Sequence, residues 1–391
     1  TTIDVTDLNN AITRANTTSN NTVLAAFASA QGDITVNDGT ITEFESLLQL
    51  ETESKINITG LNLTTTTVNV TQANTLTGAT TGTVTATVNA GGVNALTDLN
   101  ADGDNNAALS ITITDNSASA ADLNTINAAT TVAVDATAIA TISSSSLTDI
   151  STLGAAITAG SIAATTAIGS INVSGDAIDF TTLESEINRF DAFRIDPAVA
   201  AFTLADTTTV TLGTQDEVTA FIADVAAGLV SVTGASQAVT VTPSGSGGVD
   251  ISHTDAIALA AAAGGTVTAT IVNTTTVAQL ATLYDAGETN AYTITIRGAD
   301  ATGSTAAEFN AINSATSEAI NASVVTSISG TAADIATLMS AAEQTAEFTA
   351  TSFDLIAATD GLSITGTTID VTDLNNAITR ANTTSNNTVL A

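Results

Sequence analysis

The stretch Ser119–Ser143, SAADLNTINAATTVAVDATAIATIS, contains the elements from which the chain is built. It opens with a helix-start signature, SAADL, in which Ser119 is followed three residues later by an acid. The first side chain of such a signature caps the N-terminal amides of a helix, and the acid reaches back to the cap. Leu123 and Ile126 then fall on one face of a short helix. The β-branched run Thr131–Val134 follows and predicts a half-buried strand.

The same two patterns recur along the chain. Helix-start signatures begin at Asp4, Thr40, Ser119, Ser146, Thr214, Ser252, Thr276, Thr305 and Thr331. Alternating strand-like runs lie at Thr83–Val88, Ser110–Thr114, Thr131–Val134, Thr266–Ile271 and Tyr292–Ile296. Strand, helix and strand on a short repeat make parallel neighbours through right-handed crossovers. The sequence therefore predicts an α/β repeat solenoid of short parallel β-strands alternating with short capped helices.

A second, longer period frames the first. Residues Thr1–Ala25 return without one change as Thr367–Ala391, so position 1 recurs at position 367. We interpret 1–366 as one full solenoid period and 367–391 as the start of the next identical period in a tandem array. About 12 coils of about 30 residues each would fill one period. At about 4.8 Å per coil, that period would be about 58 Å long.

Composition limits the partners. The chain has 39 acidic and 6 basic residues, a net charge of -33, which disfavours nucleic acid and anionic membranes and favours divalent cations. No cysteine is present, so disulfides and thiolate metal sites are excluded. No run of about 18 apolar residues occurs, and we expect no membrane span.

One segment, DLNADGDNN at 98–106, resembles the opening of a calcium-binding loop. Oxygen-bearing side chains at alternate positions, with a glycine at the sharp turn, suit a hard cation. The candidate calcium ligands are Asp98, Asn100, Asp102 and Asp104. The twelfth position is Leu109, where the EF-hand pattern has a bidentate glutamate. The alternative is a loop whose Asp and Asn side chains satisfy the turn itself.

Catalytic patterns are absent from the sequence. The only histidine, His253, lies inside a helix-start signature. The sequence has no G-x-S-x-G nucleophile motif with which it could form a catalytic triad, so a structural role is favoured. Gly245–Ser252, GSGGVDIS, is one degenerate copy of a calcium β-roll repeat and is better interpreted as a surface loop. The acidic residues that a glycosidase would need are better explained by helix capping and solvation; they are Glu43, Glu45, Glu51 and Glu53. We expect no enzyme.

Threonines alternate along several predicted strands. The pairs are Thr85 with Thr87, Thr112 with Thr114, and Thr293 with Thr295. Stacked coils would align their hydroxyl and methyl groups on one sheet face, an arrangement that occurs on ice-binding solenoids. Threonine also has high strand propensity, and ordinary strand packing explains the pairs better.

The repeat of Ser119–Ser143, together with GTAADIATL at Gly330–Leu338, resembles the giant Ala/Thr/Asp-rich tandem-repeat proteins of marine picocyanobacteria, of the type implicated in swimming of marine Synechococcus. The resemblance lies in repeat texture, covers nearly the whole chain and transfers no site. It implies an acidic, extracellular or cell-surface structural protein that forms a rod, filament or surface layer, often with calcium-binding segments elsewhere. Its partners would be identical repeats joined end to end. The alternative is an adhesin stalk that binds glycans, cells or ice through Thr- or Asp-rich faces.

Overall fold

The computed structural model describes most of residues 58–343, with gaps at 102–105, 165–167, 176, 192–200, 233–236, 284–289 and 301. Outside that range it describes 2–4, 7, 8, 10, 34–37, 42–44, 47, 362–364 and 372. The chain divides into two compact units, Thr1–Ser174 with Ser185–Phe202 and Gly175–Glu184 with Thr203–Ala391.

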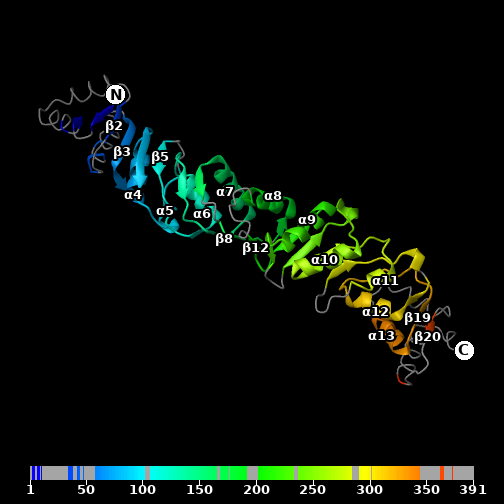
Figure 1. The fold of residues 1–391 in the computed structure, drawn as a ribbon. Helices are drawn as coiled ribbons and strands as arrows, with labels where there is room; N and C mark the ends of the chain where they lie inside the picture. Colours follow the sequence, from blue (N-terminus) through cyan, green and yellow to red (C-terminus); the bar gives the residue numbers. More distant parts are fainter. Residues whose placement is uncertain are drawn as a thin grey trace. The chain divides into compact units, whose positions relative to one another are not determined.

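The first unit alternates short strands with short helices (Figure 1). Its strands are β1 (Thr2–Asp4), β2 (Ile34–Asn37), β3 (Ile58–Val68), β4 (Thr83–Val88), β5 (Ala107–Ser110), β6 (Ser117–Ala118), β7 (Val134–Ala136), β8 (Thr141–Ser145), β9 (Ile162–Ala164) and β10 (Ser170–Val173). Its helices are α4 (Val70–Ala79), α5 (Val93–Leu96), α6 (Ala120–Asn127) and α7 (Leu147–Ala159). Helix α8 (Phe180–Asp191) and strand β12 (Ala201–Leu204) have residues in both units.

The second unit has the same alternation. Its strands are β11 (Ala177–Asp179), β13 (Thr209–Leu212), β14 (Val230–Val232), β15 (Ala238–Val241), β16 (Thr266–Thr270), β17 (Ala291–Thr293), β18 (Ser304–Thr305), β19 (Ile328–Gly330) and β20 (Leu362–Ile364). Its helices are α9 (Gln215–Ala226), α10 (His253–Ala263), α11 (Val277–Leu280), α12 (Ala306–Ser314) and α13 (Ala332–Glu343), with short 3₁₀ turns η1 (Ser244–Ser246) and η2 (Gly298–Asp300).

Strands pair in parallel and mostly in the order in which the chain makes them. In the first unit β1-β2-β3-β4-β5 form one sheet, and β6-β8-β10 and β7-β9 pair in the same sense. In the second unit β11-β13-β15-β16-β17 and β18-β19-β20 do so. The prediction of an α/β fold with parallel strands alternating with helices is thus confirmed.

The chain advances by one strand neighbour every few tens of residues. The step is 20 residues from Ile251 to Ile271 and 34 residues from Ile328 to Leu362, with the other paired strands between these values. Most steps are therefore shorter than the mean of about 30 residues that the sequence favours, and among the strand pairs whose register the structure describes only β1–β2, β11–β13 and β19–β20 exceed it.

The predicted unit of one strand per helix is too simple. Between α6 and α7 the chain makes two strands, β7 and β8, which pair in different sheets. The side chain of Asp135 turns the chain between them, since its Oδ1 accepts from the Thr137 amide at 3.1 Å and hydroxyl at 2.7 Å. These hydrogen bonds lower the pKa of Asp135, because they favour the charged carboxylate. Asn321 accepts from the Ser323 amide in the same way at 3.2 Å in the second unit.

The core is a narrow column of Val, Ile, Leu, Ala and Phe side chains between sheets and helices. Leu123 and Ile126, which are predicted to share a helix face, are both buried, and so are the equivalent pairs Phe309 with Ile312 and Ile335 with Leu338. Strand β4 buries every second residue, which confirms the period of two. Outward positions between them are mostly threonine, so the alternation alone decides which face of each strand packs inward.

The predicted helix starts are confirmed where the structure describes both cap and amide. Side chains of Ser119, Ser146, Thr214, Ser252, Thr276 and Thr305 accept from the amide three residues on. Asp4 and Thr331 accept from the equivalent amides of Asp7 and Asp334. The cap at Thr40 lies outside the described residues.

Candidate functional site

The proposed calcium loop lies partly outside the described residues. Asp102 and Asp104 are in the gap at 102–105, whereas Asp98 and Asn100 are described and exposed. The Asn74 side chain binds both: its Nδ2 donates to the Asp98 carbonyl at 2.8 Å, and its Oδ1 accepts from the Asn100 amide at 2.8 Å. The backbone of this turn is therefore held by a side chain of helix α4. Calcium binding here stays a prediction.

The other sequence candidates have structural places. His253 is the first residue of α10, after the cap Ser252, and is half-buried. Glu43 lies in a short helical segment at 42–44, and Glu45, Glu51 and Glu53 lie outside the described part of the chain. Within the described part, no group of three or more His, Cys, Asp or Glu is arranged to hold a metal ion. Nor is any described helix both long enough and apolar enough to cross a membrane.

Side-chain links between successive turns of the chain are a feature that sequence reasoning missed. The helix asparagines Asn124 and Asn310 donate to carbonyl oxygens of Asp149 and Asp334, 25 and 24 residues later, at 3.0 and 2.9 Å. Asn74 makes the matching bond to Asp98, 24 residues later. The signal is present in the sequence as Asn directly after the first buried hydrophobic residue, in DLN and EFN.

A second kind of link is made by threonine hydroxyls that bond to the backbone of a strand. The Thr130 hydroxyl donates to the Leu109 carbonyl at 2.7 Å and accepts from the Leu109 amide at 2.9 Å. Thr316 makes the same two bonds to Tyr292, at 2.8 and 2.9 Å. In each case one threonine hydroxyl pairs with both the amide and the carbonyl of a strand residue, as a neighbouring strand would. Neither backbone polar group of that strand residue is therefore left unpaired.

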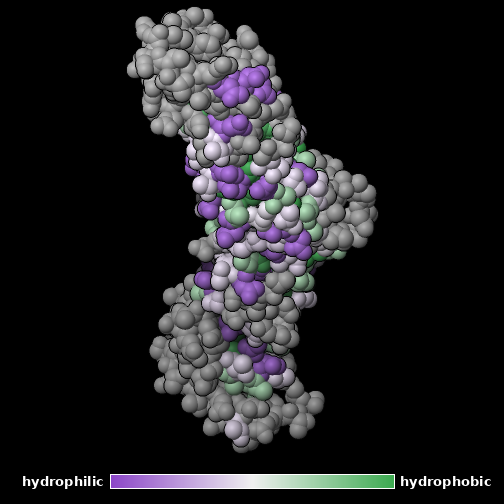
Figure 2. Space-filling view, turned by 90° about the vertical axis from the view of Figure 1, so that its left-hand side faces the viewer, coloured by the Kyte–Doolittle hydropathy of each residue, from purple (hydrophilic) through white to green (hydrophobic). Residues whose placement is uncertain are grey.

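The threonine faces of the strands point outward. Thr85, Thr87, Thr112, Thr114, Thr293 and Thr295 are all exposed. In the second unit Thr211, Thr240 and Thr268 are in register on the neighbouring strands β13, β15 and β16. In Figure 2, hydrophilic side chains are spread among side chains of intermediate hydropathy, with hydrophobic ones in narrow areas between them. The outward positions of these strands are thus occupied mostly by neutral polar side chains.

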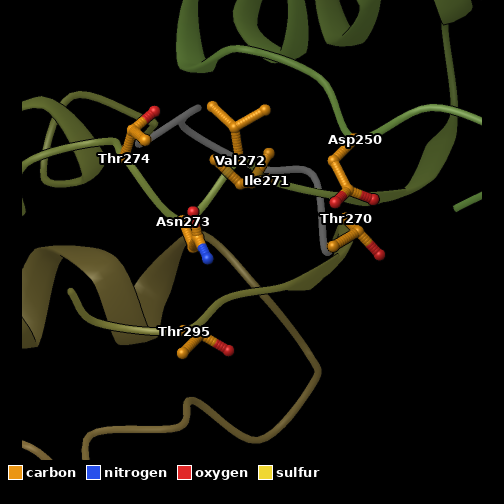
Figure 3. Close-up of a pocket in the computed structure, with 7 residues that line it drawn as sticks. All are labelled: Asp250, Thr270, Ile271, Val272, Asn273, Thr274 and Thr295. Atoms are coloured by element: carbon orange, nitrogen blue, oxygen red, sulfur yellow. The ribbon is translucent and has the colours of Figure 1, made fainter. Parts of the chain in front are cut away.

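A hollow of about 400 Å³ lies at the end of the threonine face in the second unit (Figure 3). Its lining residues are Asp250, Thr270, Ile271, Val272, Asn273, Thr274 and Thr295. Backbone bonds hold this lining from both sides: the Ile251 amide donates to Thr270 at 2.9 Å, and the Ile271 amide donates to Thr293 at 3.1 Å. Residues 270–272 therefore have a paired backbone, and Asn273 and Thr274 follow in the adjoining turn.

The loop before the hollow fixes Asp250. The carboxylate accepts from the Ser244 amide at 3.0 Å and the Ser244 hydroxyl at 2.7 Å. Residues 244–247 are exposed, which confirms the predicted surface loop. Gly248 is required there, because a Cβ at this position would overlap the backbone carbonyl oxygen of Thr242. Sequence reasoning gave this loop no role in a site.

Comparisons with family models, with curated proteins and with solved structures find no match to this chain.

Proposed function

We propose that the protein is a structural repeat protein of the cell surface or extracellular space. In this proposal the parallel strands and helices stack as a solenoid of about 12 coils per 366-residue period. Periods join end to end into a rod, filament or surface layer. The proposal assigns no catalytic role to the chain.

One observation carries the proposal. Within each unit the paired strands are parallel, and most polar side-chain bonds between neighbouring segments join residues 21 to 27 positions apart, with others 30 to 40 apart. Each such bond spans about one step between paired strands. Each strand–helix segment therefore contacts mainly the segments before and after it, as in quasi-one-dimensional repeat proteins. The strong negative charge and the resemblance to picocyanobacterial surface proteins support an extracellular role.

Two measurements test the proposal. Negative-stain electron microscopy of the native protein should show rods or filaments with an axial repeat of about 58 Å. The mass of the native chain in hot detergent then separates a covalent tandem array from subunits that assemble end to end. Isolated compact globules in the micrographs would sink the structural proposal, whatever the chain mass.

A second candidate function is an adhesin whose threonine face binds a polysaccharide or ice. The observation that favours it is the in-register row Thr211, Thr240 and Thr268, which spaces hydroxyl and methyl groups at the strand separation of about 4.8 Å. Replacing all three by alanine should abolish retention on an insoluble polysaccharide or the shaping of ice crystals. If the native protein shows neither activity, this candidate is wrong.

A further inference from the structure

We infer that the hollow lined by Asp250, Thr270, Asn273, Thr274 and Thr295 binds one residue of a neutral saccharide. The choice of a saccharide as the ligand rests on the adhesin candidate. The inference adds a specific site and the groups that would contact the sugar. The hollow, at about 400 Å³, falls in the lower part of the roughly 300 to 1,000 Å³ range of small-molecule sites.

The lining presents hydrogen-bonding groups that make no bond to the described protein. No side-chain hydrogen bond is formed there by Thr270, Asn273, Thr274 or Thr295 within the part of the chain that the structure describes. Asn273, Thr274 and Thr295 are exposed, and Figure 3 shows the Asn273 amide pointing toward the side on which Thr295 lies. An amide and hydroxyls supply both donors and acceptors, which sugar hydroxyl groups require.

The site is held in one geometry before any ligand arrives. The turn that carries Asn273 and Thr274 is closed by the Thr275 amide, which donates to the Val272 carbonyl at 3.1 Å. Arg297 also stabilises this turn, because its guanidinium donates to the Thr274 carbonyl at 3.2 Å. The two bonds from Ser244 orient the Asp250 carboxylate, which retains further acceptor capacity. Such preorganisation lowers the entropic cost of binding.

Other ligand classes fit this lining less well. An anion would be repelled by Asp250 and by the net charge of -33. A divalent cation would find one carboxylate, and the described residues hold no group of three metal-ligating acids or histidines. A flat aromatic ligand would find no aromatic side chain in the lining. A saccharide can instead donate to Asp250, bond to Asn273 and the threonines, and place a C–H face on Val272.

The test is saturation-transfer difference NMR on the native protein. The probes are D-glucose, D-galactose, D-mannose and N-acetyl-D-glucosamine, each at millimolar concentration with EDTA present. We expect saturation transfer to at least one of them. In the double variant Asn273→Ala with Thr295→Val we expect binding weaker by about tenfold for each hydrogen bond lost. Neither side chain bonds to the described protein, so circular dichroism should show an unchanged fold.

The matched control is Thr268→Ala, which removes an exposed threonine from the same strand as Thr270 but outside the hollow. Its sugar binding should equal that of the native protein. No transfer to any of the four sugars would overturn the inference, and so would transfer that survives the double variant. Sugar signals that appear only when calcium chloride replaces the EDTA would overturn the inference in favour of a cation site. The adhesin candidate fails separately, if the triple alanine variant of Thr211, Thr240 and Thr268 keeps its retention on polysaccharide.

Discussion

The carboxylate of Asp115 accepts a hydrogen bond of 2.8 Å from the backbone amide of Val93, which lies 22 residues earlier. Val93 begins α5, and the N-cap of that helix is Gly92, which has no side chain to offer. The next turn of the chain therefore caps the helix of the turn before it. The Ser145 hydroxyl does the same for the Ala120 amide at 2.8 Å, and Asp300 for the Val277 amide at 3.0 Å.

Replacing Asp115 should loosen α5 locally. Asp115→Ala removes the acceptor and should cost about 1 kcal/mol, as loss of an N-cap does. Hydrogen exchange of the segment 92–99 should then be faster by about fivefold. Asp115→Asn should cost less, because the amide oxygen still accepts. Exchange unchanged in the alanine variant would show that the bond from Val93 contributes nothing in solution.

A glycine at the cap position is part of the same contact. A Cβ added to Gly92 would lie 3.1 Å from each Asp115 carboxylate oxygen, closer than most such contacts. We expect Gly92→Ala to speed the same exchange in the native background. Combined with Asp115→Ala, it should cost much less, since the crowding oxygens are gone. Equal effects of Gly92→Ala in both backgrounds would mean that crowding by Asp115 is not the cause.

The helix asparagines should matter more than their exposed neighbours. Asn124→Ala leaves the Asp149 carbonyl without its 3.0 Å donor and should cost about 1 to 2 kcal/mol. For a unit of this size the melting temperature should fall by about 2 to 4 °C per kcal/mol. Thr125→Ala is the matched control, because its hydroxyl bonds only within its own helix, to the Ala121 carbonyl. A control that costs as much as Asn124→Ala would contradict a link between turns.

Local patterns were enough to predict much of this fold, and the reason is visible in particular residues. Strand β4 spans the predicted Thr83–Val88, and the caps at Ser119, Ser146 and Thr305 bond as their spacing requires. These features depend on residues within a few positions of one another. Helix α4 does not begin at one of the predicted helix-start signatures, and its cap is Asn69, although asparagine caps as well as serine does.

The features that sequence reasoning missed depend on residues from two turns. Nothing near Gly92 reveals that Asp115 caps its helix, because Asp115 lies 22 residues after Val93, beyond α5 and β5. The division into β7 and β8 also depends on pairing with distant strands, since β7 pairs with β9 whereas β8 pairs with β6 and β10. The hollow likewise combines Asp250, Asn273 and Thr295 from three separate segments. Such a site becomes visible only when the strand register is known.

The ion pair at η2 predicts one direction of acid sensitivity. Arg297 Nε donates to Asp300 at 2.7 Å, and this bond holds the pKa of Asp300 below its usual value of 3.8. A lowered pKa contributes stability above pH 3.8 that is lost as pH falls through the folded-state pKa.

Arg297→Gln should therefore speed hydrogen exchange of 277–283 at pH 7, with the difference from the native protein shrinking below pH 3.8. Arg297→Lys should fall between, since it keeps the charge without the planar fork. A difference that persists unchanged at pH 2 to 3 would exclude this ion pair as its cause.

Asp224 predicts the opposite dependence. Desolvation by burial raises its pKa above the usual 3.8, and the charge of Glu184 adds to the shift. Its Oδ2 is buried and has no hydrogen-bond partner among the described residues. The folded state thus binds a proton more readily than the unfolded state, so Asp224 lowers stability as pH rises from 3.8 through the raised pKa.

Asp224→Asn should raise the urea midpoint at pH 7, and the gain over the native protein should shrink as pH approaches 3.8. Asp206→Asn is the control, since it removes the same charge from an exposed position. Equal gains from both variants would assign the effect to net charge, whereas a gain confined to Asp224→Asn would assign it to burial of the Asp224 carboxylate beside Glu184.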